Sequence, residues 1–194
     1  MKKLITILSV ITLVCTSSVQ VASGAVFTFD DIINYVGEEP IPNGYGGFNW
    51  DNFWVIHRSY WPAGSGYDLG CVSPDFVAFN ASGATALLSD SVFNFNGAYL
   101  TSAWANTQDI KVEGYLGASL LYDTTVTVPN TAPTWVELNY LGIDKLQFTS
   151  LPGGFGHQFA MDNFTYTVIP APGAIALGSI GVGLVGWLRR RRTL

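Results

Sequence analysis

Two sets of side chains in this sequence have chemistry to offer, and the first is aromatic. Between positions 50 and 67 the chain carries a dense group of large rings: Trp50, Phe53, Trp54, Tyr60, Trp61 and Tyr67. Aromatic faces stack on the apolar faces of sugar rings, while neighbouring Asn and Asp side chains bond the hydroxyl groups. Tyr60, Trp61 and Tyr67 fall in a stretch rich in Pro and Gly. We therefore predict these three as glycan ligands.

The same group has a purely structural interpretation. A strand through residues 50–54 would place Trp50 and Trp54 on one face, because they are four positions apart. That face would then be part of a hydrophobic core. Both interpretations stay open at the level of sequence.

The second set is acidic. Trp50-Asp51-Asn52-Phe53 and Met161-Asp162-Asn163-Phe164 share the triplet Asp-Asn-Phe, and Asp30 with Asp31 follows Phe29. Calcium takes six to eight oxygen ligands from carboxylates and carbonyls. If the first and last strands are neighbours, Asp30 or Asp31 could meet Asp162 around one structural calcium ion. Ordinary turn residues with solvated carboxylates would give the same pattern.

Catalytic patterns are sparse, and we predict no catalytic residues. His57 and His157 are the only two histidines, and neither has a recognisable catalytic setting. The sequence has no Gly-x-Ser-x-Gly, no His-Glu-x-x-His and no phosphate-binding loop. Cys71 could act as a nucleophile only beside a histidine, and a buried structural thiol is the favoured interpretation.

Alternating apolar and polar residues predict the elements that position these side chains. In residues 109–116 the pattern places Ile110, Val112 and Leu116 on one face and Lys111, Glu113 and Tyr115 on the other. Further short strands are predicted at 26–29, 52–57, 76–80, 91–95, 99–104, 119–122, 124–128, 135–139, 145–149 and 159–168, with 37–47 an irregular loop. No stretch has a helical stripe, so the predicted fold is all-β, a jelly-roll β-sandwich.

Both ends of the chain resemble targeting segments. Lys2 and Lys3 precede an uncharged stretch at 4–14, and a small-residue site predicts cleavage by signal peptidase after Ala25. Residues 173–188 carry no charge and precede Arg189, Arg190, Arg191 and Arg192. The arginines favour a cytoplasmic C-terminus. The predicted organisation is a signal peptide at 1–25, a β-sandwich ectodomain at 26–168 and a tail at 169–194 with one transmembrane helix.

Charge divides the chain in the same way. All 14 Asp and Glu residues lie between Asp30 and Asp162, whereas that region has only three basic residues, Arg58, Lys111 and Lys145. Its formal charge is therefore −11, which excludes nucleic acid as a partner, because phosphate binding needs clustered Lys and Arg. Cations and neutral ligands remain compatible with it.

The tail resembles the PEP-CTERM sorting signal of exported bacterial proteins. Pro170 and Pro172 match the proline motif, with Ala171 where the family name has glutamate, and the uncharged segment and the arginines match the other two parts. This resemblance implies processing by an exosortase in the membrane and delivery to the cell surface. Residues 29–31 and 159–164 are similar to galactose-binding-like jelly rolls, in which a structural calcium near the termini is common.

These patterns predict an exported surface or matrix protein without enzymatic activity. It would pass through an inner-membrane intermediate, with its C-terminus in the cytoplasm, before reaching the cell surface or the medium. Binding of glycan or exopolysaccharide is the expected activity. The alternative is a secreted carbohydrate-active enzyme that uses two ectodomain carboxylates.

Overall fold

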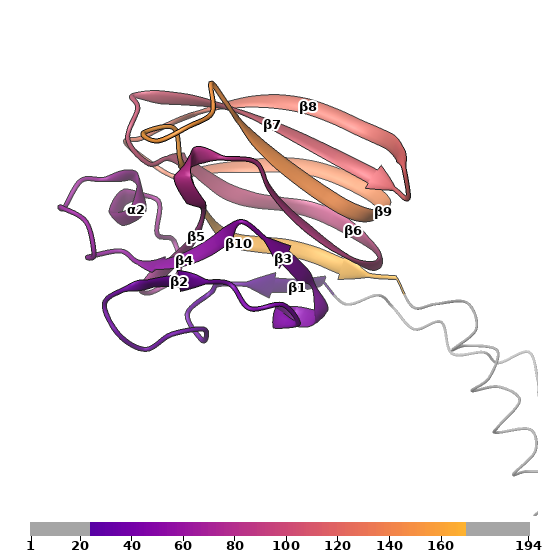
Figure 1. Ribbon diagram of the computed structural model, residues 1–194, viewed down its shortest axis with the longest axis horizontal. Helices are drawn as coiled ribbons and strands as arrows, with labels where there is room; N and C mark the ends of the chain where they lie inside the picture. The colour runs from indigo at the N-terminus through magenta and orange to yellow at the C-terminus, as the bar shows by residue number, and fades with distance from the viewer. Residues whose placement is uncertain (1–23, 170–194) are drawn as a thin grey trace, which may run out of the picture. The chain divides into compact units, whose positions relative to one another are not determined.

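Antiparallel strand pairing organises the part of the chain that the computed structural model describes, residues 24–169 (Figure 1). The strands are short near the N-terminus and long afterwards, where Thr becomes more frequent. Their bounds are β1 Gly24–Phe27, β2 Glu38–Pro40, β3 Asn49–Asp51, β4 Phe53–His57, β5 Phe76–Asn80, β6 Ala86–Ser102, β7 Thr107–Leu116, β8 Ser119–Pro129, β9 Thr134–Leu151 and β10 Phe159–Val168. One short helix, α2 (Gly66–Leu69), and the 3-10 turns η1 (Tyr45–Gly47) and η2 (Ala81–Gly83) complete the described elements.

The strands follow the order β2-β4-β5-β10-β6-β9-β7-β8, with β1 beside β10 and β3 beside β6. Strand β10 therefore lies inside the sheet, between β6 on one edge and β5 and β1 on the other. The long strands β6 and β9 each run through both layers. The first part of β6 pairs with β3 and its last part with β10, and register shifts separate the two parts. Bulges of this kind bend a strand from one layer into the next.

Aromatic and aliphatic side chains fill the space between the layers. Phe53 of β4 meets Phe148 of β9 with ring centroids 5.8 Å apart, so strands from the two halves of the order face each other. The largest fully buried side chains include Phe29, Phe48, Phe53, Phe93, Phe95, Phe148, Phe159 and Phe164. The fold is β-sandwich-like, which confirms the predicted sandwich.

A second, smaller cluster lies on the opposite face of β4 and β5. It contains Ile56, Tyr67, Val77, Phe79, Ala103 and Ala160. Because both faces of these strands are covered, all five residues of β5 are buried. The cover comes from the loop that carries α2.

The strand predictions are correct in place and often wrong in length. Strands β5 and β10 have the predicted bounds, whereas β6, β8 and β9 are each one long strand where two short ones were predicted. The predicted loop at 37–47 contains β2. Leu116 is exposed and not inward as predicted, because the register of β7 shifts between Gly114 and Tyr115.

The shared face predicted for Trp50 and Trp54 is also wrong. Asn52 has a φ of 56°, in the left-handed region, and it separates β3 from β4. The two-residue alternation therefore does not continue across it. Trp50 packs in the main core, and Trp54 packs beside the smaller cluster on the other face.

Within residues 24–169 no helix has the length and apolar character needed to cross a membrane. Residues 1–23 of the predicted signal peptide and the predicted tail helix, with Pro170, Pro172 and the four arginines, lie outside the described residues. The predicted cleavage site after Ala25 falls within β1, which pairs with β10.

Candidate functional site

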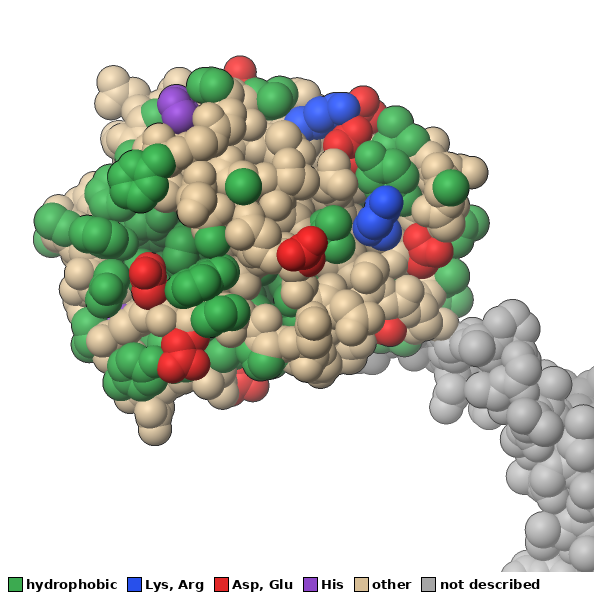
Figure 2. Space-filling model, viewed as in Figure 1, with side chains coloured by type: hydrophobic (Ala, Val, Ile, Leu, Met, Phe, Trp, Pro, Cys, Tyr) green, Lys and Arg blue, Asp and Glu red, His purple; other side chains and the backbone are tan. Residues whose placement is uncertain are grey.

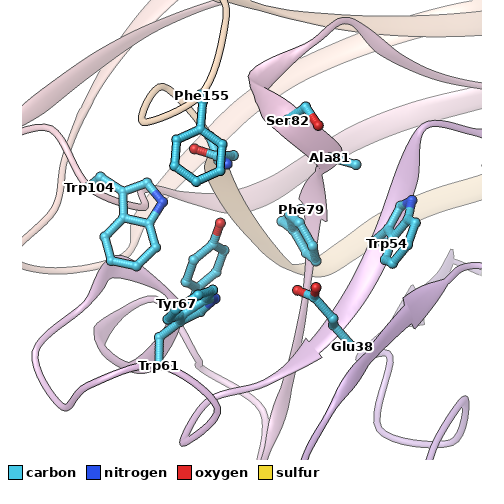
Figure 3. A pocket seen from close by; sticks show the side chains of 10 residues that line it. Glu38, Trp54, Trp61, Tyr67, Phe79, Ala81, Ser82, Trp104 and Phe155 are labelled. Carbon is cyan, nitrogen blue, oxygen red and sulfur yellow. The ribbon is translucent and has the colours of Figure 1, made fainter.

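A pocket of about 190 Å³ lies beside the outer face of β4 and β5, and most of its walls are aromatic rings (Figure 3). Figure 2 shows hydrophobic side chains gathered over the α2 end of the domain, with acidic side chains among them. The lining residues are Glu38, Trp54, Trp61, Tyr67, Phe79, Ala81, Ser82, Trp104, Phe155 and Gln158. They come from β2, β4, β5, α2, η2 and three loops.

The loop that carries Trp61 and Tyr67 is held by its own polar contacts. Ser65 caps α2 by accepting a hydrogen bond from the backbone N–H of Asp68. The Asp68 carboxylate accepts from Arg58 Nη2 at 2.8 Å and from the backbone N–H of Gly64 at 3.1 Å. These bonds fix the loop before any ligand arrives.

Close backbone contact then docks α2 against the end of β6. The N–H of Gly66 donates to the carbonyl of Ala103 at 2.9 Å. A Cβ at Gly66 would overlap the carbonyl oxygen of Ser102 and lie 2.7 Å from the Cα of Ala103. Only glycine therefore fits at this position.

Three rings form a connected wall. Trp61 and Trp104 meet edge to face with centroids 5.6 Å apart, and Tyr67 meets Trp104 at 5.5 Å. Edge-to-face pairs of this kind hold rings in defined orientations. Tyr67 is 1% exposed and forms the floor, while Trp61 and Trp104 are 39% and 37% exposed. The two tryptophans thus keep part of their surface available to a ligand.

Burial also fixes the ionisation of the floor. It raises the pKa of Tyr67, against a smaller lowering by a side-chain hydrogen bond with Trp104, and the negative field of Glu38 raises it further. The phenol is therefore neutral at physiological pH.

Phe155 lies above the pocket on the loop before β10 and is 86% exposed (Figure 3). This loop contacts η2, because the N–H of Gly154 donates to the carbonyl of Gly83 at 3.0 Å. Gln158 Oε1 accepts from the N–H of Gly156 at 2.9 Å. The loop thus brings a large, unpacked ring to the mouth of the pocket.

Two of the three predicted aromatic ligands lie together in the fold. Trp61 and Tyr67 line the pocket, although Tyr67 is buried and not in the exposed position expected for a loop residue. Tyr60 lies outside the lining and packs edge to face on Trp61 at 5.4 Å.

Sequence reasoning missed five lining residues that carry aromatic or charged groups: Glu38, Trp54, Phe79, Trp104 and Phe155. The structural interpretation of the aromatic group placed Trp54 on a core face with Trp50. Trp104 and Phe155 each follow a strand and stand among Ser, Asn or Gly residues, and an exposed ring in such a setting is the signal that was available.

The three predicted calcium ligands lie near one another in the fold but bind different partners. Strand β1 pairs with β10, so the first and last described strands are neighbours, as the prediction required. Asp30 Oδ1 accepts from the backbone N–H groups of Asp75 and Phe76, and Asp31 Oδ1 accepts from the Tyr45 hydroxyl at 2.8 Å. Among the described residues no three His, Cys, Asp or Glu side chains are grouped as metal ligands would be.

Asp162 is fully buried and accepts four hydrogen bonds. Its Oδ2 accepts from the N–H groups of Val72 and Ser73 at 2.6 and 2.7 Å, and Oδ1 accepts from the Ser73 hydroxyl and the Asn163 N–H at 2.8 and 2.6 Å. Burial raises the pKa of Asp162, and these bonds oppose the rise. The carboxylate joins β10 to the loop after α2. Calcium binding stays a prediction.

The repeated Asp-Asn-Phe triplet has a shared backbone conformation. Asn52 and Asn163 have φ values of 56° and 48°, and the phenylalanine after each is buried. Asn is tolerated in this region better than other residues with a side chain. In both places the triplet turns the strand and directs the phenylalanine into the core.

Cys71 and the two histidines are placed for structural roles. Burial raises the pKa of the Cys71 thiol to about 12, so the thiolate is not formed at neutral pH. His57 Nδ1 accepts from the Ser59 N–H, and His157 Nδ1 lies 3.1 Å from Gln108 Oε1. None of the three lines the pocket.

No protein-family model matches the chain, and no curated protein matches it. Several solved structures do. The domain is similar to adhesin and carbohydrate-binding domains.

The K2 cleaved adhesin domain of Lys-gingipain matches with a TM-score of 0.46 and 10% identity, over 76% of this chain and 99% of that chain. TmCBM61, solved with β-1,4-galactotriose, has a TM-score of 0.35 and 12% identity, over 66% and 95%. CBM51 from Clostridium perfringens GH95, solved with methyl-galactose, has a TM-score of 0.35 and 11% identity, over 75% and 100%.

Proposed function

We propose that this domain binds glycan in the aromatic pocket. The observation that carries the proposal is the pocket itself: Trp54, Trp61 and Trp104 surround one space with the buried phenol of Tyr67 at its floor. Rings offer flat apolar faces to a sugar, and polar groups at the edges, such as Glu38 and Gln158, can bond its hydroxyls.

The size of the pocket limits which ligands can fit. About 190 Å³ is less than the ~300–1,000 Å³ of pockets that enclose drug-sized molecules. One sugar ring fits this space better than a buried oligosaccharide. The domain would therefore hold a chain end or a side branch of a polysaccharide.

The composition of the pocket favours binding over hydrolysis. Glycoside hydrolases generally use two carboxylates that flank the scissile bond. Among the described residues that line the pocket, Glu38 is the single acid. We therefore propose a binding module and not an enzyme, and hydrolysis by the purified protein would contradict this.

Substitution of Trp104 by alanine tests the proposal. We expect the variant to lose glycan binding by at least ~30-fold in Kd, because a tryptophan at the centre of a binding site commonly contributes ~2 kcal/mol or more. Binding is measured on a glycan array and then by calorimetry on the best ligand.

The matched control is Trp135→Ala. Trp135 is another half-exposed tryptophan, on β9, where it packs against Tyr99 and not against the pocket. This variant should bind as the wild type does. Equal losses from both substitutions, or none from either, would place the glycan elsewhere.

We further propose that this jelly-roll-type module is exported and sorted through its tail. The support is the sequence pattern alone: the signal-like N-terminus, Pro170 and Pro172, and the arginines at 189–192. The domain is acidic and the tail is basic, which agrees with their placement on opposite sides of a membrane. A calcium ion remains a proposed cofactor.

Replacing the four terminal arginines with alanine tests the sorting proposal. We expect the protein to stall or mislocalise, because the positive charges that hold the C-terminus in the cytoplasm are gone. Surface display is measured by fractionation and antibody labelling of intact cells. The control variant replaces the four arginines with lysine, which keeps the charge, and it should be displayed normally. Normal display of the alanine variant would contradict the sorting proposal.

A further inference from the structure

The carboxylate of Glu38 points into the pocket and has no partner there (Figure 3). Among residues 24–169 no hydrogen bond or ion pair is formed by this side chain, which is half-buried on β2 opposite Ile56 of β4. Near the α2 loop, Asp68 is bound by Arg58 and Asp162 by four donors, while Asp75 is exposed and lies outside the lining. Among the described lining residues, Glu38 is the one carboxylate that a ligand in the pocket can meet.

No basic side chain offsets this charge. Of the three basic residues between positions 30 and 162, Arg58 is bound to Asp68, Lys111 to Glu113, and Lys145 lies over the Tyr115 ring. None of the three lines the pocket. The negative field of Glu38 therefore acts across the site, where it already raises the pKa of Tyr67.

The aromatic rings around Glu38 also favour a positively charged ligand. The face of an aromatic ring is negative, and Trp attracts a cation more strongly than Tyr or Phe. Three tryptophans and a neutral tyrosine with one free carboxylate make a site that stabilises positive charge. A uronic acid would place its carboxylate against all of them.

We propose that the pocket selects a sugar that carries a protonated amine, a hexosamine unit with a free amino group at a chain end or branch. The inference rests on the proposed glycan function and deepens it. The ring stacks on the tryptophans while the ammonium group pairs with Glu38. Acidic polysaccharides are rejected, in keeping with the −11 charge of the region.

Calorimetry on the full-length protein at pH 6 tests the selection, because Glu side chains are ionised and amines protonated there. The probes are a glucosamine trisaccharide, its fully N-acetylated form and a trigalacturonate. We expect the free amine to bind about tenfold more tightly than the acetylated sugar, and the uronate not to bind.

Glu38→Gln should remove the preference, so that the two amino-sugar probes bind within about threefold of each other. The matched control is Glu39→Gln, since Glu39 is the next residue and bonds the Tyr35 hydroxyl outside the pocket. It removes the same net charge and should keep the preference. Loss of the preference in both variants would assign it to overall charge and overturn the proposal.

The outcomes separate this inference from the glycan function. Equal binding of the free and acetylated sugars, or binding of neutral glycans alone, overturns amine selection and leaves glycan binding in place. No binding of any glycan overturns both. Binding of tetramethylammonium as tightly as the trisaccharide overturns the sugar assignment and identifies a simple ammonium site.

Discussion

Replacing Asp162 with alanine is expected to lower the free energy of unfolding by at least ~3 kcal/mol. The change removes an acceptor that is fully buried and satisfies the N–H groups of Val72 and Ser73. Hydrogen bonds to a charged group contribute ~1.5–3 kcal/mol each, and a buried donor without a partner costs ~1–3 kcal/mol. Urea unfolding followed by tryptophan fluorescence measures the loss.

Asp51→Ala is the matched control, because Asp51 occupies the same place in the other Asp-Asn-Phe triplet but is exposed. It should change the unfolding free energy by less than ~0.5 kcal/mol, as surface substitutions usually do. Similar effects at both positions would show that the four bonds to Asp162 do not stabilise the fold.

Thermal unfolding of the wild type and of the Asp162→Ala variant, with and without EDTA, decides the role of calcium. A chelator does not change the stability that the hydrogen bonds to Asp162 provide. A calcium ion bound to the folded state stabilises it more the more tightly it binds, and a chelator removes that stabilisation. If the wild type loses thermal stability in EDTA and the Asp162→Ala variant does not respond, Asp162 is a calcium ligand. An unchanged midpoint for the wild type contradicts the predicted structural calcium.

Substitution of Gly66 by alanine is expected to destabilise the domain by about 2 kcal/mol. Alanine has the better helix propensity, which taken alone would favour the variant by up to ~1 kcal/mol. The added methyl group, however, overlaps the backbone at Ser102 and Ala103, and backbone cannot move aside as a flexible side chain can. Overpacking of this kind usually costs ~1–3 kcal/mol.

The Gly66 variant should also disturb the pocket, because the helix that begins there carries Tyr67. Thermal unfolding measures stability, and quenching of Trp61 and Trp104 fluorescence reports the position of the loop. Leu69→Ala, on the same helix with a half-exposed side chain, is the control and should leave both nearly unchanged. Wild-type stability in the Gly66→Ala variant would mean that α2 does not dock as described.

The sandwich-like fold could be predicted from the sequence because the alternation of apolar and polar residues in a strand is a local signal. Residues 76–80 and 159–168 have strong β patterns between breakers, and both form strands with those bounds. The merged strands β6, β8 and β9 were not predictable in the same way. The bulges that carry β6 and β9 through both layers depend on partner strands, and no local pattern indicates them.

The pocket was only partly predictable, for a related reason. Trp61 and Tyr67 belong to one visible cluster, whereas Trp104 and Phe155 come from loops far along the chain. Contact between such loops is a property of the tertiary fold. The role of Glu38 was harder still to predict, because β2, the strand that directs it toward the pocket, lies in a stretch predicted as an irregular loop.

The position of β10 inside the sheet constrains when the domain can form. Its pairing with β6, β5 and β1 joins elements from both ends of the described chain. Assembly must therefore wait until residue 168 has been synthesised and has left the ribosome, since earlier strands lack their central partner. A cut after Ile169 leaves every described strand pair intact, whereas a cut within β10 removes the strand that holds the sheet together.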